Sequence, residues 1–116
     1  MLVDDDRLVR RSLKRMLERQ GYRVVEAGGV AEALNLAERQ PVDAVVTDMW
    51  MDDGNGLGLV RQLAARGLRR PTVLLTAMPE DQHEAQAREL GVAAILQKPI
   101  TLEDLCAALE ATLAAK

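Results

Sequence analysis

Polar side chains that could handle a metal ion and a phosphoryl group directly follow, or close, short apolar segments of this sequence. They are three carboxylates, one hydroxyl and one ammonium group: Asp4, Asp5, Asp48, Thr76 and Lys98. Carboxylate oxygens are the ligands that Mg²⁺ prefers, and two or three suffice because the ion keeps several waters. Asp48 could then act as a nucleophile toward a phosphoryl donor, with Lys98 stabilising charge on the transferring oxygens. These residue types predict a magnesium-dependent phosphoryl site.

The clustering itself argues for a cation. Two carboxylates ~4 Å apart, at an effective dielectric of ~20, repel each other by about 4 kcal/mol. A divalent cation, aided by Lys98, removes that penalty. Each feature alone has an ordinary structural explanation, such as helix capping by acidic residues, the role we expect for Asp6. The prediction therefore depends on the joint occurrence of these residues at strand ends.

The segments that position these residues alternate regularly between two kinds. Short apolar runs with strand character are Met1–Val3, Arg23–Ala27, Ala44–Thr47, Thr72–Thr76 and Ala93–Gln97. Segments with apolar residues at helical spacing follow each run, around residues 9–17, 33–37, 59–64, 80–90 and 101–113. This alternation predicts an α/β fold, a doubly wound parallel sheet with helices on both faces. Ligands of such sheets bind at the carboxyl ends of the strands, where the polar residues lie.

The composition limits the possible functions. The 116 residues suit one domain, and the 48% hydrophobic content supplies a core. The aromatic content of 2% and the net charge of −3 argue against nucleic-acid binding. Cys106 is the only cysteine, so an internal disulfide and a cysteine metal cage are excluded. We find no signal peptide and no apolar run near the ~18–20 residues of a membrane span, and expect a cytoplasmic protein.

The motifs at the strand ends resemble those of the receiver domains of two-component signalling, including the chemotaxis response regulators. The segments that carry the resemblance are LVDDD, VVTDMWMDDGNGLGLV, VLLTA and LQKPI. It covers the whole chain and implies one receiver domain over residues 1–116, either free-standing or part of a longer protein. The implied fold is the flavodoxin-like (βα)5 sheet with strand order 2-1-3-4-5. The family is not enzymatic in the usual sense, because it catalyses only its own phosphorylation and dephosphorylation.

The resemblance also assigns the metal and the phosphoryl acceptor. It implies that Asp48 is phosphorylated by a sensor histidine kinase, a phosphotransfer protein or a small phospho-donor. Asp5 and Asp48 would be direct Mg²⁺ ligands. Asp4 would act mainly through water, and the backbone carbonyl of Trp50 would be a further ligand.

The remaining assignments concern the switch. Thr76 would bind a phosphoryl oxygen after transfer, and Lys98 would pair with the phosphoryl group. The Lys98–Pro99 peptide bond would be cis. The face formed by the fourth helix, fifth strand and fifth helix would engage an output domain or a second copy in a homodimer. No nucleic acid or membrane is expected to bind this domain directly.

Two departures from the family pattern affect the switch. Asp52 stands four residues after Asp48, where the family usually has proline, so the segment 52–56 is expected to be more mobile. Ile95 occupies the position of the family's rotating Tyr or Phe. The aromatic side chain that usually couples the site to the face of the fourth helix, fifth strand and fifth helix is therefore missing.

A third departure concerns the lifetime of the phosphorylated state. Trp50 and Met78 occupy the two positions that in this family tune autodephosphorylation. Both are bulky and neither can orient a water molecule. We therefore predict a long-lived phospho-Asp48.

Other functions fit parts of the sequence. Asp4-x-Asp6 formally matches the motif of haloacid-dehalogenase-like hydrolases, which also form an aspartyl-phosphate, but no cap insertion is present. A flavodoxin-like cofactor carrier would need a phosphate-cradling loop after the first strand, and none follows it. A degenerate receiver that serves as a docking module stays open. His83, the only histidine, lies on a polar helix and is expected to be exposed and without a role.

Overall fold

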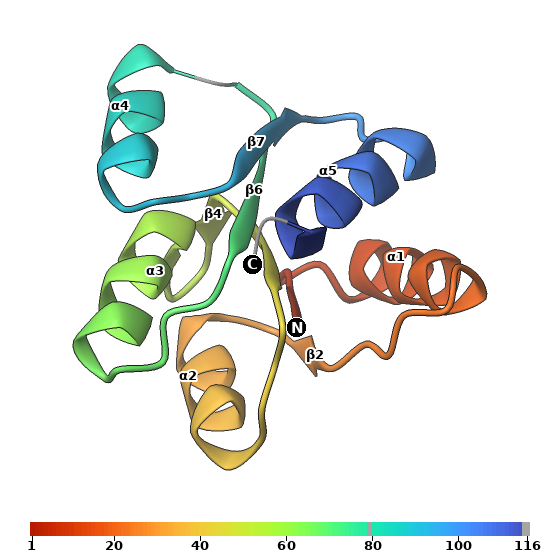
Figure 1. The fold of residues 1–116 in the computed structure, drawn as a ribbon, viewed down its shortest axis with the longest axis horizontal. Coiled ribbons are helices and arrows are strands. Elements are labelled where there is room, and N and C mark those ends of the chain that lie inside the picture. Colours follow the sequence, from red (N-terminus) through yellow and green to blue (C-terminus); the bar gives the residue numbers. More distant parts are fainter. Residues whose placement is uncertain (79, 115–116) are drawn as a thin grey trace.

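A five-stranded parallel sheet forms the centre of the computed structural model, which describes residues 1–78 and 80–114 (Figure 1). The strands of this sheet are β1 (Leu2–Val3), β2 (Glu26–Ala27), β3 (Val45–Asp48), β6 (Thr72–Thr76) and β7 (Ala94–Gln97). Their order is β2-β1-β3-β6-β7, and each neighbouring pair is parallel. Counted along the chain, this is the predicted order 2-1-3-4-5, so the flavodoxin-like fold is confirmed.

Helices cover both faces of the sheet (Figure 1). Those of the described residues are α1 (Arg7–Arg19), α2 (Val30–Arg39), α3 (Gly56–Ala65), α4 (Asp81–Glu89) and α5 (Leu102–Ala114). Helices α1 and α5 pack on one face, and α2, α3 and α4 on the other. The chain therefore forms three layers, with the sheet buried in the middle.

The central strands are rich in apolar residues, as expected for a parallel sheet that is covered on both faces. Successive side chains of a strand point to opposite faces. Leu2 and Val46 accordingly pack with α1 and α5, whereas Val3 and Val45 pack with α2 and α3. This double burial fixes the strands whose ends carry the polar residues.

Two segments differ from the predicted elements. Residues 23–25 precede β2 instead of belonging to it, because β1 has only two residues and pairs with Glu26 and Ala27 alone. Residues that were expected to form only a loop make an antiparallel hairpin of β4 (Trp50–Met51) and β5 (Gly54–Asn55). This hairpin lies directly after Asp48 and becomes part of the site.

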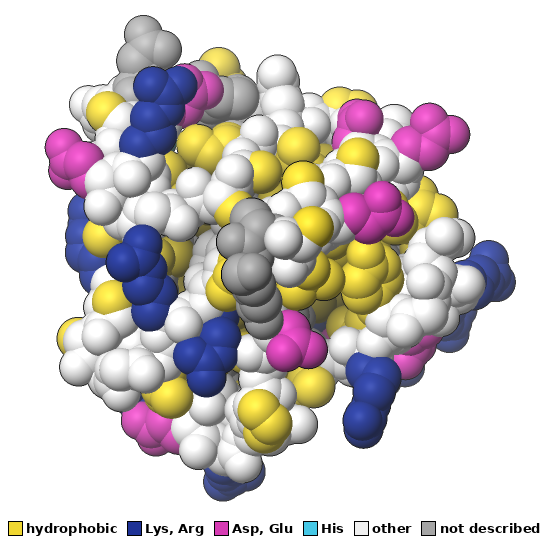
Figure 2. Space-filling model, in the orientation of Figure 1, with side chains coloured by type: hydrophobic (Ala, Val, Ile, Leu, Met, Phe, Trp, Pro, Cys, Tyr) yellow, Lys and Arg dark blue, Asp and Glu magenta, His cyan; other side chains and the backbone are white. Residues whose placement is uncertain are grey.

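The surface carries charge over the helices. On the face shown in Figure 2, apolar side chains are visible between α5 and α1, and basic side chains stand on the outer side of α1. Among the described helices, none combines the length and the apolar character needed to span a membrane.

Candidate functional site

The predicted site residues lie at the carboxyl ends of four neighbouring strands. Asp4 and Asp5 directly follow β1, Asp48 and Thr76 end β3 and β6, and Lys98 directly follows β7. The carboxyl ends of parallel strands meet at one edge of a sheet. Four buried or partly buried elements therefore bring the five side chains to that edge.

The three predicted metal-binding carboxylates converge. One oxygen from each of Asp4, Asp5 and Asp48 lies within 4.8 Å of the other two. Asp4 is 1% exposed and Asp48 is 5% exposed, whereas Asp5 is open to solvent. The cluster therefore has a buried floor and one accessible side.

Lys98 is the charge partner of the buried carboxylate. Its Nζ lies 2.5 Å from Oδ1 of Asp48. The backbone N–H of Lys98 donates to the carbonyl of Thr76 at 2.8 Å, which ties the lysine to the end of β6. The peptide bond between Lys98 and Pro99 is cis, as predicted. Asp48, Thr76 and Lys98 are thus joined through neighbouring strand ends.

The electrostatics of Asp48 are unusual for a carboxyl group. Burial, together with the Asp4 carboxyl beside it, raises the pKa of Asp48 from 3.8 to about 7. The ammonium group of Lys98 acts in the opposite direction but does not overcome the burial. Positive charge added at this point would be strongly stabilising.

The hydrogen bonds of the cluster fit a bound cation. Oδ1 of Asp4 accepts the backbone N–H of Asp6 at 2.8 Å. Oδ2 of Asp4 is buried and accepts no hydrogen bond from the described residues. A buried carboxylate oxygen without a partner is costly. Because the three carboxylates offer hard oxygen ligands around this atom, the residues present fit Mg²⁺.

Asp6 does not belong to the cluster. Its side chain caps α1 by accepting the backbone N–H groups of Leu8 at 3.0 Å and Val9 at 3.2 Å. The predicted capping role is confirmed. The Asp4-x-Asp6 interpretation as a hydrolase motif therefore lacks its second carboxylate at the site.

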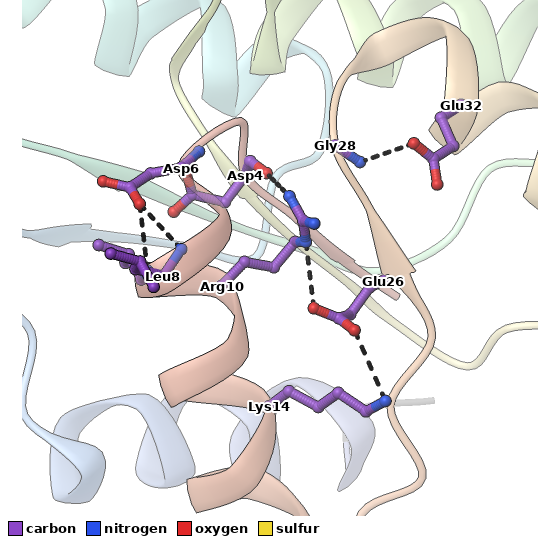
Figure 3. A network of polar contacts seen from close by, with 9 residues as sticks. Asp4, Asp6, Leu8, Arg10, Lys14, Glu26, Gly28 and Glu32 are labelled. Atoms are coloured by element: carbon purple, nitrogen blue, oxygen red, sulfur yellow. Dashed lines mark hydrogen bonds and ion pairs between the residues drawn. The ribbon is translucent and has the colours of Figure 1, made fainter.

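Arg10 is a site residue that the sequence did not reveal (Figure 3). Its Nη1 donates to the backbone carbonyl of Asp4 at 2.6 Å, and its Nε donates to Glu26 at 3.1 Å. Lys14 lies 3.6 Å from the other oxygen of Glu26. Helix α1 is thereby fastened to the ends of β1 and β2. Nothing in the sequence distinguishes Arg10 from the other basic residues of α1, because its partners lie on other elements.

Two exposed side chains border the site. Trp50 is 60% exposed and Met78 is 75% exposed. The Trp50 ring contacts His83 of α4 edge-on, with ring centroids 5.5 Å apart. The side chain of His83 is only 15% exposed, and its Nδ1 lies 3.6 Å from Glu80. The prediction of an exposed His83 is therefore wrong, because the ring of Trp50 in strand β4 packs against it.

The glycines after Asp48 have different roles. Gly54 adopts a φ of +149°, a backbone conformation that favours glycine. Gly56 is not among the described glycines with a positive φ. A Cβ on Gly56 would stand 2.7 Å from the carbonyl oxygen of Asp48, so glycine is needed there for close packing.

Comparisons with known proteins agree with this geometry. The family model of the response regulator receiver domain matches residues 1–110. The response regulator MprA of Mycobacterium leprae is 39% identical over 113 residues, which cover 97% of this chain and 50% of that protein. The chain thus spans about half the length of this curated relative.

Solved structures are similar over nearly the whole chain. The HemR receiver domain of Leptospira biflexa is 34% identical, with a TM-score of 0.88 over 97% of this chain and 91% of that one. A Burkholderia pseudomallei response regulator, solved with a phosphorylated aspartic acid and a calcium ion, is 29% identical. Its TM-score is 0.86 over 98% of this chain and 67% of that one.

Proposed function

The chain belongs to the response regulator receiver family, and we propose that it accepts a phosphoryl group on Asp48 in a magnesium-dependent reaction. Receivers of this family act in two-component phosphorelay signalling and are not enzymes of the usual kind. One observation carries the assignment to Asp48. This carboxylate is buried, lies 2.5 Å from the Lys98 ammonium, and shares its corner with the carboxylates of Asp4 and Asp5.

We assign the metal ligands to the same corner. Asp5, Asp48 and the backbone carbonyl of Trp50 would hold Mg²⁺ directly, and Asp4 would act mainly through water. When bound, the ion supplies positive charge for the carboxylates and for the oxygens of the incoming phosphoryl group. The backbone N–H of Asp52 donates to Oδ2 of Asp5 at 2.8 Å and orients that ligand.

The transfer step uses Asp48 as the nucleophile. An oxygen of its ionised carboxylate forms a bond to phosphorus while the bond between phosphorus and the donor breaks. With a phosphohistidine donor the electron pair of the broken bond stays on the imidazole nitrogen, and with acetyl phosphate it stays on acetate. Lys98 balances the negative charge of the phosphoryl oxygens, and the burial of Asp48 beside its ammonium strengthens that interaction.

After transfer the site holds a larger anion. The phosphoryl group adds roughly −1.5 to −2 charges at neutral pH. Thr76, 5% exposed at the end of β6, would donate its hydroxyl to a phosphoryl oxygen. Lys98 would then pair with the phosphoryl group instead of the free carboxylate. Movement of Thr76 would transmit the change to α4, β7 and α5.

The remaining assignments concern the setting of this domain. We propose one receiver module over residues 1–116, located in the cytoplasm, that catalyses only its own phosphorylation and dephosphorylation. The donor would be a sensor histidine kinase or a phosphotransfer protein, and the face of α4, β7 and α5 would engage an output domain or a second copy. The phosphorylated aspartic acid and calcium ion of the Burkholderia relative support the acceptor type and the cation site.

The test is incubation with Mg²⁺ and acetyl phosphate, followed by intact mass measurement. We expect one added phosphoryl group on the wild type, and none on Asp48→Asn or in the presence of a chelator. Asp52→Asn is the matched control, because it removes a nearby carboxylate that is not an acceptor. A folded protein that binds Mg²⁺ but gains no mass would contradict phosphoryl acceptance and favour the docking-module alternative.

A further inference from the structure

The hairpin that follows Asp48 is fastened to helix α2 through one carboxylate. Oδ1 of Asp53 accepts the backbone N–H of Val30 at 2.8 Å, and Oδ2 accepts that of Ala31 at 3.1 Å. Helix α2 begins after Gly29, which has no side chain with which to cap it. Asp53 therefore caps α2 from a segment 23 residues further along the chain.

The contact between the hairpin and α2 leaves no spare room. A Cβ on Gly29 would stand 2.6 Å from Oδ1 of Asp53. A Cβ on Gly54 would stand 3.1 Å from Val30. The carboxylate can reach the helix end because both positions are glycine.

The other side of the hairpin touches the metal site. The backbone N–H of Asp52, the residue before Asp53, donates to Asp5 at 2.8 Å. Trp50, whose carbonyl is a proposed ligand, pairs with Asn55 across the hairpin. Asn55 in turn caps α3 by accepting the N–H of Gly58 at 2.8 Å. A shift of the hairpin would therefore move groups on two sides of the cation.

We propose that Asp53 is a positioning residue of the metal site: by holding the β4–β5 hairpin on α2, it places the Trp50 carbonyl and the Asp52 N–H against Asp5 and Asp48. This inference depends on the proposed function, because it assumes that these groups surround Mg²⁺. Groups that orient metal ligands from outside the coordination sphere commonly change metal affinity when they are removed. Asp53 touches none of the ligands itself and acts through the backbone of its neighbours.

The first test measures metal binding without phosphorylation. Mn²⁺ alone serves as the probe, and the electron paramagnetic resonance signal of free Mn²⁺ gives the dissociation constant. We expect Asp53→Ala to weaken binding by about 10-fold. Asp53→Asn should lose less, because its amide keeps one acceptor oxygen.

Two control variants test whether a loss of Mn²⁺ affinity comes from the position of the hairpin, and not from helix capping or from a change of charge. Glu32 lies at the same end of α2 and accepts the backbone N–H of Gly28 at 3.1 Å (Figure 3). Glu32→Gln should leave Mn²⁺ affinity unchanged. Asp52→Asn removes a charge beside the site without breaking the cap, and should lose less affinity than Asp53→Ala.

Gly29→Ala keeps every charge and displaces the Asp53 carboxylate by crowding it. It should weaken Mn²⁺ binding as well, and it keeps the proposal testable if Asp53→Ala does not fold. In phosphorylation assays, both variants should need more Mg²⁺ for half-maximal rate and should approach the wild-type rate at saturation. If Asp53 only stabilised helix α2, the two variants would have a lower melting temperature, but the Mg²⁺ concentration for half-maximal rate would not change.

The outcomes distinguish this inference from the function on which it depends. If the wild type binds no Mn²⁺ or Mg²⁺, both the metal site and the role of Asp53 are wrong. If the wild type binds and Asp53→Ala and Gly29→Ala bind equally well, only the positioning role is wrong. An equal loss in Asp52→Asn would also overturn it, because the effect would then be one of charge.

Discussion

Burial and two neighbouring side chains, Asp4 and Lys98, act on the carboxyl group of Asp48, and their balance determines whether it can react. Burial and Asp4 favour the protonated form, Lys98 favours the ionised form, and the resulting pKa is about 7. A protonated carboxyl is a poor nucleophile. Cation binding requires ionised ligands and therefore also prepares the nucleophile. The proposed metal dependence of the reaction would thus follow from the burial of a single side chain.

This raised pKa predicts a pH-dependent stability for the metal-free protein. Between the ordinary value of 3.8 and about 7 the folded state keeps a proton that the unfolded state loses. The free energy of unfolding therefore falls as pH rises through this window. In a chelator at pH 8, Asp48→Asn should be more stable than the wild type by about 1–3 kcal/mol. Urea unfolding of both proteins at about pH 3 and at about pH 8, which lie on either side of this window, measures the difference.

The difference should shrink at the acidic end, where Asp48 is protonated in both states. Added Mg²⁺ should stabilise the wild type more than the variant, because the variant lacks one ligand. An equal stability difference at both pH values would show that the pKa of Asp48 is not raised.

The exposed residues beside Asp48 predict slow dephosphorylation. Trp50 and Met78 border the site, and neither side chain can hold a water molecule in line with the phosphorus. After removal of the donor, the phosphorylated mass should persist for minutes or longer. Trp50→Gln introduces an amide that can orient water and should shorten the lifetime, whereas Met78→Leu should not. Loss of the phosphoryl group from the wild type within seconds would contradict the prediction.

The residues proposed to bind the metal and the phosphoryl group were predictable from the sequence, and those that support them were not. Asp4, Asp48 and Lys98 were predictable because each stands at the end of a recognisable apolar strand. Arg10 and Asp53 contact elements other than their own, so their roles depend on the folded arrangement. One signal was present for Asp53: Val30 begins a helix after Gly29, a residue that cannot cap it.

At the scale of elements, the hairpin β4–β5 connects the site to α4. Ile95 leaves the output face without the aromatic residue that the family usually has there. The edge-on contact between Trp50 and His83, with centroids 5.5 Å apart, offers another aromatic link between the site and that face. Ring pairs of this kind contribute about 0.5–1.5 kcal/mol. A shift of Trp50 on phosphorylation would therefore alter its contact with helix α4.

This contact can be measured through Trp50, the only tryptophan. His83→Ala should increase the quenching of Trp50 fluorescence by acrylamide, because one face of the indole loses its cover. Glu80→Gln removes the carboxylate that lies 3.6 Å from Nδ1 of His83 but keeps the ring, and should behave like the wild type. Equal quenching in all three proteins would mean that the two rings are not in contact in solution.

The elements themselves were predicted with uneven success, for identifiable reasons. The strand Thr72–Thr76 was predicted with its observed bounds, because its apolar centre is flanked by threonines and all five residues are buried. The second strand was predicted too long, since its length depends on the two residues of β1 with which it pairs. The hairpin was not predicted, because it follows from the contacts of Asp53 and Asn55 with two helices.

At the scale of the whole molecule, the residues that stabilise the doubly wound sheet lie apart from the residues that form the site. Helices on both faces bury the strands, and the strand ends emerge at one edge with their polar residues. The placement of helices on both faces follows from the alternation of strands and helices, whereas the strand order was implied by the resemblance to receiver domains. The same edge gathers the carboxylates of Asp4, Asp5 and Asp48, so one fold-level feature creates the site.

The central claim is that Asp48, among several neighbouring carboxylates, takes the phosphoryl group. After incubation with Mg²⁺ and acetyl phosphate, borohydride reduces an aspartyl-phosphate to homoserine with release of phosphate, and peptide mass spectrometry locates the product. We predict homoserine at position 48 alone, dependent on both the donor and the metal. Homoserine at Asp4, Asp5 or Asp52, or a phosphorylated His83 in its place, would contradict the account.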